Sequence, residues 1–164
     1  MKKQTQFRLW VLYALFLLIC SLLETTLLAR FPIFGVRIVL LPAVAALVGV
    51  HRGAEQGGIF GLIAGVYWVL AGAGSPMVVL TMTLGGLFAG WLCDAVLTRN
   101  LLSALIASAV SLLGTLTIAG LVHAYMRGGS ALILLYSVWQ TLISLPFAAV
   151  LYYPARSIGR TDEP

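Results

Sequence analysis

Residues 57–90 read GGIFGLIAGVYWVLAGAGSPMVVLTMTLGGLFAG, a stretch without a charged side chain in which small residues recur through both halves. Its glycines repeat at intervals of four, as Gly57, Gly61 and Gly65 and again as Gly86 and Gly90. On a helix each set forms a smooth ridge, and such ridges let helix backbones approach closely in lipid. The intervening segment 72–76, GAGSP, contains turn residues that a helix interior tolerates poorly. The stretch therefore predicts a tight hairpin of two membrane helices, at 57–71 and 77–93.

The composition places the rest of the chain in a membrane as well. Of the 164 residues, 61% are hydrophobic and only 9% are charged, which is more apolar surface than one small water-soluble core can hide. The net charge of +5 comes from Lys and Arg residues that stand singly at the ends of apolar runs, so it indicates membrane topology and not a nucleic-acid partner. We expect residues 1–164 to form one polytopic membrane domain.

Apolar runs separated by short polar breaks predict an all-α membrane protein, a compact bundle of six transmembrane helices. The expected spans are 9–28, 36–50, 57–71, 77–93, 101–125 and 131–153. The second run is short and contains Pro42, which predicts a kink there, and a re-entrant segment is the alternative interpretation. Connecting segments follow at 29–37, where apolar residues alternate with helix breakers, and at the RGGS turn, 127–130.

Six spans place both termini on one side of the membrane, and the distribution of cations predicts which side. The following residues share the side of the termini: Lys2, Lys3, Arg8, Arg52, Arg99, Arg156 and Arg160. Only Arg30, Arg37 and Arg127 lie opposite. Cytoplasmic segments are enriched in Lys and Arg, so both termini are expected in the cytoplasm.

Two polar residues inside the apolar runs are candidates for specific contacts. Glu24 lies near the end of the first span, where it either pairs loosely with Arg30 or Arg37 at the interface or contacts another helix or a partner subunit. Gln140 lies in the middle of the last span and predicts an interhelical hydrogen bond worth roughly 1 kcal/mol.

Residues that could carry out catalysis are scarce. The chain has five carboxylates and two histidines, which do not cluster, and it contains no HExxH, GxxxxGK[ST] or GxSxG motif. Cys20 and Cys93 belong to no CxxC or Cys/His pattern and are expected to be free, buried thiols. We therefore expect no enzyme, and no catalytic, cofactor-binding or metal-binding residue.

Several motifs, in order, resemble the MreD family of bacterial rod-shape-determining proteins. They are a basic N-terminus, a long span ending in ETTLL, the connection FPIFGVR at 31–37, a short second helix, the turn HRGAEQGG at 51–58, and GLIAGVYWVLAGAGSPM at 61–77. The resemblance covers nearly the whole chain. It departs from the family pattern at Trp68 or a neighbouring residue, where relatives often carry an acid, and at Ile38 and Val39, where they often have a Pro-Asp pair. The resemblance is therefore to a divergent member of the family. We expect the aromatic bulk of Trp68 to replace a polar contact.

The resemblance implies a non-enzymatic subunit of the cell-elongation machinery in the bacterial inner membrane. Such a subunit binds the single-pass protein MreC and, through it, helps couple actin-like MreB filaments to the peptidoglycan polymerase and transpeptidase. The candidate contact residues are then Glu24, Arg37, Trp68 and Gln140.

The expected fold is also similar to the six-helix substrate-binding subunits of energy-coupling-factor vitamin transporters. The alternative function is therefore capture of a small molecule, for which a polar-lined pocket should form near Glu24, Arg37 and His123.

Overall fold

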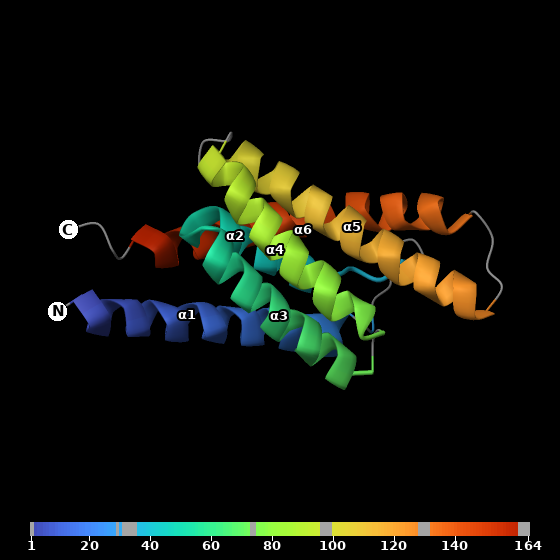
Figure 1. Ribbon diagram of the computed structural model, residues 1–164, viewed down its shortest axis with the longest axis horizontal. Coiled ribbons are helices and arrows are strands. Elements are labelled where there is room, and N and C mark those ends of the chain that lie inside the picture. Colours follow the sequence, from blue (N-terminus) through green and yellow to red (C-terminus); the bar gives the residue numbers. More distant parts are fainter. Residues whose placement is uncertain are drawn as a thin grey trace.

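The described residues of the protein form an all-helical bundle (Figure 1). The computed structural model describes residues 2–28, 30, 36–72, 75–95, 100–127 and 132–160. The elements are α1 (Lys2–Leu22) with the π-helical turn η1 (Leu23–Leu28), α2 (Leu41–Arg52), α3 (Ala54–Leu70), α4 (Met77–Ala95), α5 (Leu101–Arg127) and α6 (Leu132–Arg160). The start of α1 and the end of α6 lie at the same end of the bundle (Figure 1). The connection expected at 31–35, the turn at 128–130 and Arg99 lie outside the described residues.

Four helical stretches within the described residues are long and apolar enough to cross a membrane. They are Gln6–Thr26, Met77–Ala95, Leu101–Met126 and Leu132–Ile158. The helices α2 and α3 are shorter apolar helices. These properties are those of a membrane protein.

The short helix α2 occupies the centre of the bundle. Every residue from Leu41 to Val50 is buried, and α2 contacts α1, α3, α4, α5 and α6. Small side chains at Ala43, Ala46 and Gly49 let the neighbouring helices approach. Protein rather than lipid therefore surrounds α2 on all sides.

The prediction of a second helix at 36–50 is wrong for residues 36–40, and so is the predicted kink at Pro42. The segment 37–40 is not helical, the helix begins at Leu41, and Pro42 lies in its first turn. Proline fits this position because the N–H groups of the first turn have no partner inside the helix. The proline therefore starts α2 and does not bend it.

The helices α3 and α4 pack with their backbones in close contact, and the glycines named in the sequence lie in this interface. A Cβ atom added at Gly61 would overlap the carbonyl oxygen of Met82, and one at Gly65 would lie 2.6 Å from the Cα atom of Val79. Gly57 and Gly86 face each other in the same way, and a Cβ atom at Gly90 would overlap the backbone of Ala54. The ridges thus join helices of the same chain.

A glycine of α2 extends this interface to a third helix. A Cβ atom at Gly49 would lie 3.0 Å from the backbone nitrogen of Gly90, and one at Gly57 would lie 2.5 Å from the Cα atom of Gly49. Gly49, Gly53 and Gly57 also follow one another at intervals of four, but the polar break at 51–56 separates Gly49 from the uncharged stretch 57–90. Its place in this interface is therefore visible only in the folded chain.

The last helix continues past its predicted end at 153. It runs to Arg160 with Pro146 and Pro154 inside it. Tyr152 and Ala155 are buried, and the Tyr13 hydroxyl donates a hydrogen bond of 3.1 Å to the carbonyl oxygen of Ala155. This contact with α1 holds the end of α6 in the bundle.

Candidate functional site

The carboxylate of Glu24 binds the start of α2 from a different helix. Its Oε2 atom accepts hydrogen bonds from the backbone N–H groups of Leu40, at 2.8 Å, and Leu41, at 3.0 Å. Glu24 lies in η1, a π-helical turn. Such turns are rare in proteins, and those that occur are often found at functional sites. A negative charge at a helix N-terminus is also favoured by the helix dipole. Glu24 therefore caps α2. Of the two predicted alternatives, loose pairing with an arginine or contact with another helix, the structure has the contact with another helix.

Side chains of α6 bind the same non-helical segment from the other side. The Gln140 side chain donates a hydrogen bond of 2.8 Å from Nε2 to the carbonyl oxygen of Arg37. The backbone N–H of Val39 donates to the Ser144 hydroxyl at 3.1 Å. Polar side chains of η1 and α6 thus satisfy a buried, non-helical backbone. Such a backbone is tolerated at membrane depth only where protein groups or water replace its missing helical hydrogen bonds.

A further hydroxyl bonds the first turn of α2 from α5. Ser111 donates a hydrogen bond of 3.1 Å to the carbonyl oxygen of Pro42. Ser111 and Ser144 are both buried and were not among the candidate contact residues. In the sequence, these two serines do not differ from the other small residues of α5 and α6. They are distinguished only by lying opposite the start of α2, which the tertiary structure determines.

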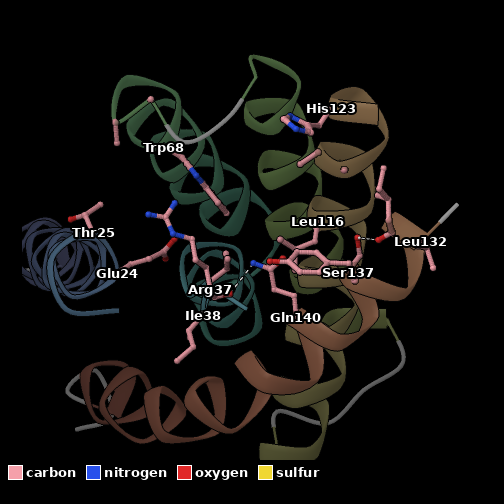
Figure 2. Close-up of a pocket in the computed structure, with 17 residues that line it drawn as sticks. Glu24, Thr25, Arg37, Ile38, Trp68, Leu116, His123, Leu132, Ser137 and Gln140 are labelled. Atoms are coloured by element: carbon pink, nitrogen blue, oxygen red, sulfur yellow. Dashed lines mark hydrogen bonds between the residues drawn. The ribbon is translucent and has the colours of Figure 1, made fainter. Parts of the chain in front are cut away.

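A cavity of about 630 Å³ opens beside this segment, and it brings the four candidate contact residues together (Figure 2). Glu24, Arg37, Trp68 and Gln140 all line it, and so does His123. The rest of its wall is mostly apolar or aromatic and includes Ile38, Val39, Leu116, Ala119, Leu132, Ile133 and Tyr136. The cavity lies at the end of the bundle opposite the chain termini, between η1 on one side and α5 and α6 on the other (Figure 2).

Trp68 lies at the top of this cavity, close to Arg37 in the view of Figure 2. Its half-buried side chain packs against the buried cores on both sides of α2. The aromatic side chain therefore fills a position between the bundle core and the cavity, and Arg37 is the charged residue nearest to it in the figure.

The other reactive side chains are dispersed. Within the described ranges, no group of three or more His, Cys, Asp and Glu side chains could hold a metal ion. Cys20 and Cys93 are buried, and neither forms a disulfide bond with another described residue. His51 lies at the end of α2 near the termini, where its Nδ1 atom is 2.8 Å from the carbonyl oxygen of Leu47.

The chain matches no protein-family model, no curated protein and no solved structure. The site therefore has to be interpreted from its own geometry.

Proposed function

We propose that the protein is a non-enzymatic integral membrane scaffold of the bacterial cell-elongation complex, a divergent relative of the MreD family. It binds an MreC-like single-pass partner and, through it, helps couple MreB-like filaments to the peptidoglycan polymerase and transpeptidase. The observation that carries the proposal is that the polar side chains inside the bundle bind the chain's own backbone. Glu24, Gln140, Ser144 and Ser111 all hold the segment around the start of α2.

The lengths of the elements support a six-span topology. The non-helical residues 36–40 cover at most roughly 16 Å, at about 3.3 Å per residue, and the 12 residues of α2 add about 18 Å. Together they match the hydrocarbon core of about 30 Å. With α2 and α3 counted, the chain crosses the membrane six times, and both termini lie in the cytoplasm.

The partner has to dock on an outward face of the bundle, because the glycine ridges are occupied. Gly61 and Gly65 pack against the backbone of α4, so replacing them by larger residues would disturb folding as well as binding. The outward faces offer large exposed apolar side chains, such as Val11, Leu15 and Leu18 on α1 and Leu135 and Trp139 on α6. In a membrane, these side chains face either lipid or the transmembrane helix of a partner.

The test is co-purification from bacterial membranes. The tagged protein is expressed with the MreC-like protein of the same genome, or with an unrelated single-pass protein at equal abundance. We expect a stoichiometric complex with the first and background recovery of the second. Equal recovery of both would refute the proposed partner, and a rod shape maintained after depletion of the protein would refute the cellular role.

The cavity supports a second candidate, a vitamin-type capture subunit of an energy-coupling-factor transporter. That function requires a pocket near Glu24, Arg37 and His123, and all three residues line the cavity. Co-expression with the transporter's ATPases and its transmembrane coupling subunit distinguishes the two functions. Co-purification with these subunits, and not with the MreC-like protein, would favour capture.

A further inference from the structure

The cavity has the size and the wall of a ligand site. Its volume of about 630 Å³ lies within the range of roughly 300–1,000 Å³ that small-molecule sites occupy. The wall is largely apolar, with a few polar groups at fixed positions. The Tyr13–Ala155 hydrogen bond joins α1 to α6 near the termini, whereas at the opposite end the cavity lies between η1 and the start of α6.

Arg37 places a positive charge on the wall of this cavity, on the side of the Glu24 carboxylate. Its side chain is exposed and forms no hydrogen bond or ion pair with another described residue. Its backbone is fixed, because Gln140 binds its carbonyl oxygen. Figure 2 shows the guanidinium directed toward the side of Glu24 and Thr25. A guanidinium on a fixed backbone is suited to bidentate binding of a phosphate.

The carboxylate of Glu24 does not cancel this charge completely. Its Oε2 atom already binds the N–H groups of Leu40 and Leu41 at the positive end of α2. His123, also exposed on the cavity wall, lies on the other side of the cavity, on α5 (Figure 2). The polar part of the cavity therefore favours an anion, while the remainder of its wall favours a hydrocarbon chain.

We propose that the cavity binds a membrane phospholipid with an anionic headgroup. Arg37 binds the phosphate, and the acyl chain enters the apolar part of the cavity beside Trp68, Leu116 and Ile133. This inference goes beyond the proposed scaffold function, and it does not depend on the identity of the protein partner.

The test measures lipid binding to the detergent-purified full chain by native mass spectrometry. The protein is titrated with dioleoylphosphatidylglycerol, with dioleoylphosphatidylcholine and with inorganic phosphate. We expect one molecule of phosphatidylglycerol to bind at least about fivefold more tightly than phosphatidylcholine, as one arginine near an anionic headgroup contributes. Inorganic phosphate alone should not bind in the same concentration range.

Two variants locate the binding site. Arg37→Gln should abolish the preference for phosphatidylglycerol, and the fold is retained because Gln140 binds the backbone and not the side chain of residue 37. Arg8→Gln is the matched control, since Arg8 is an exposed arginine of α1 at the end with the termini. Ala119→Trp, which fills the cavity from α5, should weaken binding of both lipids at least tenfold.

Three outcomes would overturn the proposal. They are equal binding of the two lipids to the wild-type protein, a preference that persists in Arg37→Gln, and binding of inorganic phosphate as tight as that of the lipid. The last outcome would identify a free anion as the ligand. None of these measurements involves the MreC-like protein, so failure here and failure of the scaffold proposal are distinguishable.

Discussion

At the scale of single residues, Glu24 shows how one polar side chain can determine the course of the backbone inside a membrane. Its carboxylate satisfies two N–H groups that belong to another segment, at the start of α2. An N–H group left without an acceptor in such a place costs about 1–3 kcal/mol. Glu24 therefore stabilises the start of α2, where the non-helical segment 37–40 ends.

The variant Glu24→Ala tests this role. We expect it to lower the free energy of unfolding by about 2–5 kcal/mol, because two donors lose their acceptor. Glu24→Gln should lose less than half of that, since the amide retains an acceptor oxygen. Thermal unfolding in detergent measures the difference, and Glu55→Ala, an exposed carboxylate in the first turn of α3, serves as the control with an effect below about 1 kcal/mol. Equal losses for Glu24→Ala and Glu55→Ala would contradict the capping role.

Gln140 and Ser144 act on neighbouring residues of the same segment and should be energetically coupled. Gln140→Leu should cost about 1 kcal/mol, as a single interhelical hydrogen bond in a membrane protein does. Ser144→Ala removes the acceptor of the Val39 N–H. The double variant should deviate from the sum of the single variants by at least about 0.5 kcal/mol. Strict additivity in a double-mutant cycle would show that the two contacts hold the segment independently.

At the scale of elements, the interface of α2, α3 and α4 depends on the absence of side chains. Six glycines of these helices face backbone atoms of a neighbouring helix, so that even one methyl group has no space: Gly49, Gly57, Gly61, Gly65, Gly86 and Gly90. Gly114 of α5 is different, because a Cβ atom there would meet nothing within 4 Å. Replacing a glycine by alanine should therefore change the stability differently at different positions of the chain.

The pair Gly61→Ala and Gly114→Ala tests this difference. Gly61→Ala should destabilise by about 1–3 kcal/mol, since the added methyl group overlaps the backbone of Met82 and forces the helices apart. Gly114→Ala should be neutral or stabilising by up to about 1 kcal/mol, because alanine favours the helix. The melting temperatures in detergent report both effects. A loss of stability at Gly114 equal to that at Gly61 would argue against close packing as the cause.

At the scale of the whole molecule, the arrangement of the helices determines which residues face each side of the membrane. The beginning of α1 and the end of α6 lie together, and the end of α5 lies opposite (Figure 1). The cavity lies at that opposite end. With the termini in the cytoplasm, it would be near the outer surface of the membrane.

Labelling with a membrane-impermeant maleimide tests this orientation. In spheroplasts, Tyr125→Cys should be labelled, because Tyr125 is 91% exposed at the outer end of α5. Ser157→Cys, exposed near the end of α6, should react only after the membrane is disrupted. The native protein is the control, since Cys20 and Cys93 are buried and should remain unlabelled. Labelling of Ser157→Cys in intact spheroplasts would reverse the proposed orientation.

Much of the architecture could be predicted from the sequence. Apolar run length and composition indicate membrane helices whatever their neighbours are, because the lipid imposes this requirement on each segment separately. The same holds for the small-residue ridges, whose spacing of four places them on one face of a helix. The low number of reactive side chains could also be predicted from the sequence, because it is a property of the composition.

The tertiary structure alone decided how the candidate residues are used. Glu24, Arg37, Trp68 and Gln140 come from four separate segments, and only the packing of η1, α3 and α6 around the start of α2 brings them to one cavity. The late start of α2 likewise depends on acceptors and donors more than 15 residues away in sequence, at Glu24, Gln140 and Ser144. The sequence by itself determined that the chain forms apolar helices for a membrane, because that depends on local composition. The cavity and the buried, non-helical backbone depend on contacts between distant segments, which only the folded chain defines.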